Sequence, residues 1–212
     1  MIRSSSTKLV DVVGLYMNPP EHAIVLSVDE KSQVQALERN QPLLPLREGL
    51  AARHTHDYKR HGTITLFAAL DVATCRVLVE CKTRHRRQEY LAFLKRIDED
   101  VEATLDVHLI VDNYATHKHP NVKAWLMKHS RFHVHFVPTQ SSWLNMVERF
   151  FAELTNKRLR RGNFTSARQL VRSIRGYIEQ HDDDSQPFVW STSAGRILLK
   201  LQHLKAICET VH

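Results

Sequence analysis

Five short runs of mainly apolar residues alternate along the chain with longer polar stretches. Their length and their bounding turn residues predict β-strands. The expected strands cover 23–28, 63–70, 76–81, 107–111 and 132–136. The second and third are separated by a few turn residues and predict a hairpin, whereas the first and fourth stop at Asp29 and Asp112. Aspartate often ends a strand, because its side chain hydrogen-bonds the backbone that follows.

Longer stretches with apolar residues at three- and four-residue steps predict amphipathic helices. The expected helices begin at Arg87, at Pro120 and at Ser141 or Ser142, and two more lie near 165–180 and 194–209. Proline is tolerated in a first helical turn, and serine is a common N-cap. Two other segments predict irregular structure. They are 38–62, a long loop with two prolines, two glycines and many charges, and 1–20, a linker that ends in Asn-Pro-Pro.

The order strand, hairpin, helix, strand, helix, strand, helix predicts an α/β fold in which helices flank a mixed sheet. The 212 residues suffice for one domain with its own core. No stretch reaches the about 18 consecutive apolar residues of a membrane span, and the N-terminus lacks the apolar segment of a secretory signal. Three scattered cysteines indicate a reducing compartment without disulfides. We therefore expect a cytoplasmic protein that has no membrane partner.

The chain is strongly basic, with a formal net charge of +7 and an isoelectric point of about 9.5. Nucleic acid is the first partner to consider for such a surface. Seven basic residues and no acidic one lie between 155 and 177, namely Lys157, Arg158, Arg160, Arg161, Arg168, Arg172 and Arg175. Solvated helix faces usually mix the two signs, so this segment favours contact with DNA over a plain solvated surface.

Three acidic residues are candidates for one shared site. Asp29 and Asp112 follow strands that, if adjacent and parallel, end side by side at the sheet edge where α/β proteins bind ligands. Glu148 lies on the helix after Ser142, next to its apolar stripe. Two carboxylates about 4 Å apart repel by about 4 kcal/mol at an effective dielectric near 20, so such a cluster takes up protons or holds cations. Taken singly, each acid also fits a turn or a surface position, and Glu30 is expected at the surface.

Oxygen ligands select hard ions, which makes Mg²⁺ or Mn²⁺ the expected cofactor of this cluster. Two such ions about 3.5–4 Å apart activate a water or a 3′-hydroxyl and stabilise the leaving oxygen of a phosphodiester. An alternative transition-metal site is offered by the histidine pairs at 54 and 56, 117 and 119, and 133 and 135. No cysteine or third ligand stands at zinc-like spacing. Polar or DNA-facing positions are therefore the favoured interpretation of these histidines.

Four blocks of the sequence, in order, resemble bacterial insertion-sequence transposases of the mariner superfamily. The blocks are VDEKSQVQAL (28–37), THDYKRHGTITLFAALDVATC (55–75), VDNYATHKHPNVKAWL (111–126) and PTQSSWLNMVERFFAELTNKRLRRGNF (138–164). The resemblance runs from about Asp11 to Trp190. It implies a ribonuclease H-like catalytic domain with a DDE triad, in which Asp29, Asp112 and Glu148 ligate two divalent metal ions.

The resemblance also implies a reaction and its partners. Such enzymes hydrolyse a DNA strand at the ends of the element and join the freed 3′-hydroxyl to target DNA. The implied partner is double-stranded DNA, the implied active form is a homodimer, and the implied location is the bacterial nucleoid. Phosphate contacts are implied for Lys157, Arg158, Arg160 and Arg161, and supporting roles for Asn113, His117 and Asn145.

We expect a linker remnant over 1–20, the catalytic domain over 21–190 and a C-terminal helix over 191–212. Members of the family carry an N-terminal helix-turn-helix region that recognises the ends of the element, and the sequence predicts a chain without it. Two alternatives stay open at this point. One is another ribonuclease H-like nuclease, which would cut without joining. The other is a catalytically silent, DNA-binding remnant of a decayed element.

Overall fold

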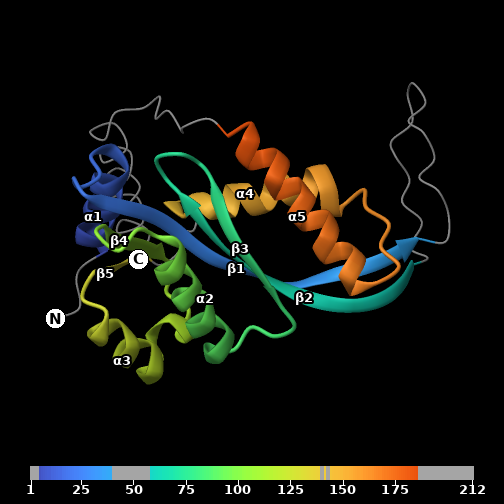
Figure 1. Ribbon diagram of the computed structural model, residues 1–212, viewed down its shortest axis with the longest axis horizontal. Coiled ribbons are helices and arrows are strands. Elements are labelled where there is room, and N and C mark those ends of the chain that lie inside the picture. The colour runs from blue at the N-terminus through green and yellow to red at the C-terminus, as the bar shows by residue number, and fades with distance from the viewer. Residues whose placement is uncertain (1–4, 40–57, 139–140, 142–143, 186–212) are drawn as a thin grey trace, which may run out of the picture.

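The computed structural model describes residues 5–39, 58–138, 141 and 144–185. At its centre lies a five-stranded sheet in the order β3-β2-β1-β4-β5 (Figure 1). The strands are β1 (Ala23–Arg39), β2 (Tyr58–Asp71), β3 (Val77–Lys82), β4 (Asp106–Val111) and β5 (Phe132–Phe136). β1 pairs antiparallel with β2 and parallel with β4, and β2 and β3 form the expected hairpin. The mixed sheet predicted from the sequence is therefore confirmed.

Helices cover both faces of the sheet. They are α1 (Ser5–Met17), α2 (Arg87–Asp100), the 3₁₀ helix η1 (Ala115–Lys118), α3 (Pro120–Lys128), α4 (Met146–Leu154), the π-helical turn η3 (Thr155–Leu159) and α5 (Ala167–Asp183). Leu66 and Phe67 are neighbours in β2 and point to opposite faces, as the strand period requires. Leu66 packs with α4 and α5, and Phe67 packs with α2 and α3. The helices expected at Arg87, at Pro120 and near 165–180 are confirmed.

The first strand differs from its prediction. β1 does not stop at Asp29 but runs on to Arg39, because its second half pairs with β2, with a register shift between Lys31 and Val34. Its parallel pairing with β4 ends at Ser27, opposite Ile110. Asp29 therefore lies inside a strand, yet just past the point where β1 and β4 part. That position keeps it near the end of β4, as the sequence predicts.

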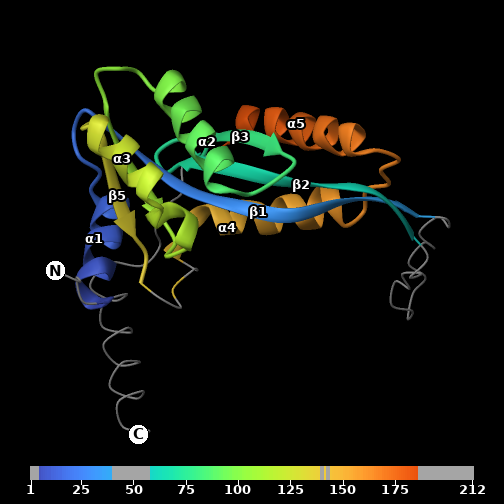
Figure 2. The ribbon, with the colours of Figure 1, turned by 90° about the horizontal axis from the view of Figure 1, so that it is seen from below.

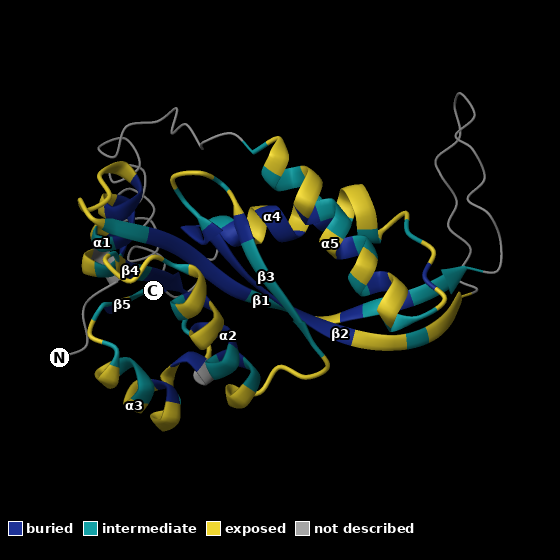
Figure 3. Ribbon diagram, viewed as in Figure 1, coloured by how far each residue is buried: buried dark blue, intermediate teal, exposed yellow. Residues whose placement is uncertain are grey.

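The expected loop over 38–62 is also partly wrong. Residues 38 and 39 belong to β1, and 58–62 begin β2. This end of the β1–β2 pair does not pack on a core, and most side chains from Tyr58 to Thr63 are exposed (Figure 3). The strands form there because β2 pairs with the second half of β1. Residues 40–57 lie outside the described part of the chain, as do the helix expected near 194–209 and the segment 191–212.

The N-terminal segment is a packed helix where a linker was expected. α1 lies against β5 (Figure 2). Its buried side chains join a third core cluster, whose members from α1 are Leu9, Val12, Val13, Leu15 and Tyr16. The Tyr16 hydroxyl donates a hydrogen bond of 2.6 Å to the backbone oxygen of Leu144, just before α4. Residues 5–17 are thus part of the folded core.

The start of α4 differs from the sequence prediction as well. The helix begins at Met146, with Asn145 in the N-cap position, and not at Ser141 or Ser142. The Asn145 side chain makes no capping hydrogen bond, because it is used in contacts with β1. None of the helices within the described residues is long and apolar enough to cross a membrane.

Candidate active site

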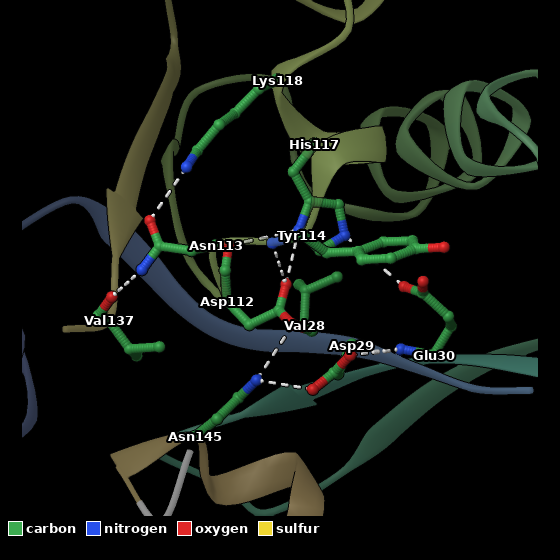
Figure 4. A network of polar contacts seen from close by, with 10 residues as sticks. All are labelled: Val28, Asp29, Glu30, Asp112, Asn113, Tyr114, His117, Lys118, Val137 and Asn145. Carbon is green, nitrogen blue, oxygen red and sulfur yellow. Dashed lines mark hydrogen bonds and ion pairs between the residues drawn. The ribbon is translucent and has the colours of Figure 1, made fainter. Parts of the chain in front are cut away.

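Asp29 is a buried carboxylate in the middle of β1, with only 8% of its surface exposed. Its Oδ1 accepts a hydrogen bond of 2.7 Å from the backbone N–H of Glu30, and its Oδ2 accepts one of 3.0 Å from Asn145 Nδ2 (Figure 4). Burial raises the pKa of Asp29 to about 7. The charges of Asp112, Glu148 and Glu30 act in the same direction, against the Glu30 N–H, which lowers it. At neutral pH this side chain readily takes a proton or a cation.

Asp112 follows β4 directly and is half-buried. Its Oδ1 accepts a hydrogen bond of 2.9 Å from the Tyr114 N–H and lies 3.0 Å from His117 Nδ1. Burial raises the pKa of Asp112, but His117 and the Tyr114 N–H outweigh burial, and the pKa lies below its usual range. The bond to Tyr114 is the turn contact expected of an aspartate that ends a strand. Asp112 thus both begins a turn and presents a charged carboxylate near Asp29.

Glu148 lies in the first turn of α4, and its side chain is exposed. Its charge raises the pKa of Asp29, and α4 packs on the sheet face that carries Asp29 and its ladder partner Ala68. Within the described residues, no three acidic, histidine or cysteine side chains are close enough to hold a metal ion. Asp112 and Glu148 therefore act electrostatically on Asp29, while the three carboxylates stand further apart than the ligands of a single bound ion.

His117 fills the space between Asp112 and Glu30 and is almost completely buried. Its Nδ1 faces Asp112 Oδ1, and its Nε2 lies 3.4 Å from Glu30 Oε2. The ring also packs against Tyr90, with 4.5 Å between the ring centroids. Burial lowers the pKa of His117, but the two carboxylates outweigh burial and raise it to about 9. His117 is therefore buried between two acids, with one carboxylate near each ring nitrogen.

Glu30 is a functional candidate that the sequence analysis misplaced. Its side chain is only 9% exposed, whereas a surface position was expected. Asp29 and Glu30 are consecutive in β1, so their side chains leave the strand on opposite faces. Asp29 pairs across the ladder with Ala68 of the α4 and α5 core, and Glu30 with Phe67 of the α2 and α3 core. Strand alternation past Asp29 was the signal that could have located it.

Asn145 connects α4 to β1 and is 1% exposed. Its Nδ2 donates to Asp29 Oδ2 and, at 3.3 Å, to the backbone oxygen of Val28. Its Oδ1 accepts from the Ser27 hydroxyl, whose oxygen in turn accepts a bond of 3.0 Å from the Val147 N–H. Asn145 thus contacts Asp29 directly, and this contact is one way in which it could have the supporting role expected for it. Ser27 is a second residue that the sequence analysis missed.

Asn113 points away from the acids and joins two strands. Its Nδ2 donates a bond of 2.6 Å to the backbone oxygen of Val137, and its Oδ1 accepts one of 3.1 Å from Lys118 Nζ (Figure 4). The amide thereby fixes the backbone after Asp112. Its contacts within the described residues are structural, and none reaches the three acids.

The basic residues after α4 surround a hollow between η3 and α5. We call it the basic hollow and define it by four of its lining residues, Lys157, Arg158, Arg161 and Arg172. Arg158 Nε donates a bond of 2.8 Å to Ser173 Oγ, and Lys157 pairs with Glu153 at 2.9 Å. Arg160 does not line the hollow, and its backbone oxygen accepts a hydrogen bond from the Arg39 guanidinium. Of the four expected phosphate contacts, the structure brings three together and adds Arg172.

The paired histidines of β5 form a polar network with β4 and α1. His135 Nε2 lies 3.0 Å from His108 Nδ1, and His135 Nδ1 lies 2.9 Å from Asp11 Oδ2. His119 caps α3 by accepting from the Asn121 N–H and does not share the contacts of His117. His54 and His56 lie outside the described residues. No transition-metal site is found among the histidines that the structure describes.

Comparison with known proteins identifies relatives of this chain. The family described as DDE superfamily endonuclease matches residues 25–171, well over half of the chain. The chain is 32% identical over 90 residues to the insertion element IS630 uncharacterized 39 kDa protein of Shigella sonnei, a match that covers 42% of this chain and 26% of the relative.

Two solved structures have similar folds. One is the Mos1 mariner paired end complex with Mn, at 16% identity and a TM-score of 0.63, covering 85% of this chain and 55% of that chain. The other is the catalytic domain of Mos1 mariner transposase, at 14% identity and a TM-score of 0.56, covering 86% and 81%. The chain thus spans about half of the longer Mos1 chain and about a quarter of the IS630 protein. The likeness confirms the ribonuclease H-like fold expected from the sequence.

Proposed function

The chain belongs to the family of DDE superfamily endonucleases, and we propose that it is the catalytic domain of a DNA transposase that cuts and joins DNA strands at the ends of a mobile element. The observation that carries this proposal is the position of the buried Asp29, just past the end of the pairing of β1 with β4, which Asp112 follows, and on the sheet face covered by α4, which carries Glu148. The charges of Asp112 and Glu148 both act on the pKa of the buried Asp29 carboxylate. An acid cluster of this kind has a use in phosphodiester chemistry, where it binds cations.

The donor set fits divalent metal ions. Asp29, Asp112 and Glu148 offer only carboxylate oxygens, which suit Mg²⁺ or Mn²⁺. Burial of Asp29 beside two further acids leaves negative charge that a cation would offset. We propose that these three residues hold two such ions, which would supply Lewis-acid activation of the attacking oxygen and stabilisation of the leaving oxygen. To hold these ions, the exposed Glu148 would have to move closer to the two aspartates.

The residues around the acids hold them in place. Asn145 orients Asp29 through Oδ2 and is itself fixed by Ser27, whose hydroxyl oxygen also accepts from the Val147 N–H. These contacts lock the first turn of α4 to β1. Because Glu148 is part of that turn, the lock also determines how far Glu148 stands from Asp29.

We propose that the basic hollow holds the backbone of double-stranded DNA. Three arginines and a lysine converge there. Arg158 uses only its Nε toward Ser173, which leaves its two terminal nitrogens for phosphate, whereas Lys157 Nζ would share its N–H groups between Glu153 and phosphate. Arg158 follows Glu148 by ten residues, on the helical segment formed by α4 and η3. The hollow would therefore contact phosphates along the same DNA that reaches the three acids. In the active form, a homodimer would bring two element ends together.

A strand-joining assay tests the proposed function against its alternatives. Purified protein is incubated with DNA that carries candidate element ends and with a second target DNA, in Mn²⁺ or Mg²⁺ and in chelator. Metal-dependent joined products are the expected result. Cleavage without joining would favour a different nuclease of the same fold, and DNA binding without cleavage would favour a silent remnant.

A further inference from the structure

We propose that Glu30 and His117 form a positioning pair that orients the Asp112 carboxylate and thereby sets the affinity of the site for divalent ions. The inference rests on the proposed function, because it takes Asp112 as a metal ligand. It assigns a role to Glu30, which faces away from Asp29 and has no place among the three acids. The pair acts through Asp112 and does not touch the metal or DNA itself.

The contacts of Asp112 are divided unequally between its two oxygens. Oδ1 accepts from the Tyr114 N–H at 2.9 Å and lies 3.0 Å from His117 Nδ1. Oδ2 has no hydrogen-bond partner among the described residues. Rotation of the carboxylate would give up the hydrogen bond from Tyr114 and the ion-pair contact with His117, whose Nδ1 also lies 3.4 Å from the backbone oxygen of Asp112. Asp112 therefore keeps Oδ2 available as a ligand.

His117 can hold the Asp112 carboxylate in one orientation only if the His117 ring is itself held in place. The ring is buried, with Tyr90 packed on it and with Glu30 Oε2 3.4 Å from the nitrogen that does not face Asp112. His117 meets one carboxylate at each ring nitrogen. Glu30 at Nε2 and Tyr90 on the ring face thus fix how the His117 ring is turned. Such outer contacts of metal ligands are known to govern metal affinity.

Within the described residues, His117 is the basic side chain that forms an ion pair with the buried Glu30. Its Oε2 is buried and makes no hydrogen bond of good geometry. A carboxylate is expensive to bury unless a charge of opposite sign accompanies it, and His117 is the partner that the structure places beside it. A glutamate that served only to stabilise the fold would be better replaced by an apolar side chain of the same size.

The test is a double-mutant cycle on Mn²⁺ binding, measured in the complete chain without DNA. The loss of the electron paramagnetic resonance signal of free Mn²⁺ gives the dissociation constant and is independent of catalysis. The variants are Glu30→Gln, which keeps the shape of the side chain, His117→Phe, which keeps a ring without nitrogen atoms, and the double variant. Thermal unfolding is recorded for each, so that misfolded protein is recognised.

Each single variant is expected to bind Mn²⁺ about tenfold more weakly, the lower end of the effect of an outer contact. The double variant is expected to bind no more weakly than His117→Phe, because Glu30 acts through His117. His117→Asn, which restores an N–H near the Nδ1 position but leaves a cavity, should recover affinity while losing thermal stability. Unchanged Mn²⁺ affinity in both single variants would overturn the inference. A double variant whose loss of affinity equals the product of the two single losses would also overturn it, because Glu30 would then act on the metal directly through its charge.

Two controls separate this inference from the proposed function. Glu38→Gln removes the carboxylate of a second glutamate and histidine pair, in which Oε2 of Glu38 in β1 lies 2.6 Å from Nε2 of His61 in β2, and should leave Mn²⁺ affinity unchanged. Asp112→Asn should abolish tight binding. If the wild-type chain and Asp112→Asn bind Mn²⁺ alike, the proposed metal site is wrong and the positioning pair with it. If only Asp112→Asn loses affinity, the site stands and the positioning pair is wrong.

Discussion

The side-chain amide of Asn145 donates a hydrogen bond of 3.0 Å to Oδ2 of Asp29 and so joins the residue before α4 to the centre of β1. The same side chain also contacts Ser27 and the backbone of Val28. Glu148 follows three residues later on the first turn of α4. The distance between the first and third acids of the site therefore depends on this buried amide.

Asn145→Ala should destabilise the fold and weaken DNA cleavage together. The substitution leaves the Ser27 hydroxyl, the Val28 carbonyl and Asp29 Oδ2 without their partner, and unsatisfied buried groups cost about 1–3 kcal/mol each. Because water can re-solvate part of the gap, we expect the free energy of unfolding to fall by about 2–3 kcal/mol, measured by denaturant titration. The control is Asn121→Ala, at an exposed position, which should change the free energy of unfolding by less than about 0.5 kcal/mol. If the free energy of unfolding falls equally in the two variants, the prediction is wrong.

Tyr16→Phe tests whether α1 is part of the folded core. Loss of the hydrogen bond to the Leu144 oxygen should lower the free energy of unfolding by about 1 kcal/mol, the usual value for one such bond. Thermal unfolding of Tyr16→Phe and of the exposed Tyr114→Phe makes the comparison, because both lose only a hydroxyl. If Tyr16→Phe is as stable as Tyr114→Phe, the hydrogen bond from α1 does not stabilise the fold and the prediction is wrong.

The stability of the chain should decrease in mild acid because of His108. Burial lowers the pKa of His108, and the neighbouring His135 and His133 lower it further, against Asp106 and Asp11, which raise it. The unfolded chain binds this proton near pH 6.5, whereas the folded chain binds it only at lower pH. The neutral form thus contributes stability above about pH 6.5, and this contribution is lost as the pH falls through the folded pKa.

The measurement for this prediction is the unfolding temperature between pH 5 and pH 8. His108→Gln should reduce its dependence on pH, whereas the exposed His85→Gln should leave it as in the wild type. A pH dependence that His108→Gln does not alter would show that other groups cause the loss of stability.

The basic hollow should control the salt dependence of DNA binding. Changing Arg158, Arg161 and Arg172 together to Gln removes three cations that line it. Each lost phosphate contact reduces the slope of log affinity against log salt by about 0.9, so a reduction of up to about 2.7 is expected from fluorescence anisotropy titrations. The control changes three exposed lysines of α2 and α3, Lys95, Lys123 and Lys128, to Gln. If the two triple variants have the same slope, the hollow is an ordinary basic surface.

The positions of Asp29 and Asp112 could be predicted because each follows an apolar run that must be buried in a sheet. The extension of β1 beyond Asp29 could not, because residues after Lys31 are held by pairing with β2, which no local pattern records. The burial of Glu30 depends on His117, which reaches it from η1 on the far side of β4. A supporting role for Asn145 was implied by the resemblance to the transposase family, but its bond to Asp29 required the tertiary structure.

The central claim is that Asp29, Asp112 and Glu148 form one catalytic site, and DNA cleavage by single variants tests it most directly. Asp29→Asn, Asp112→Asn and Glu148→Gln are assayed with Mn²⁺ on the same DNA as the wild type, beside Asp100→Asn and Glu99→Gln, which change surface acids of α2. We predict that the first three lose metal-dependent cleavage by at least about 100-fold, a loss that corresponds to about 2.7 kcal/mol in the barrier, while remaining folded. The two surface variants should cleave as the wild type does. Full cleavage by a folded Asp112→Asn protein would contradict the claim.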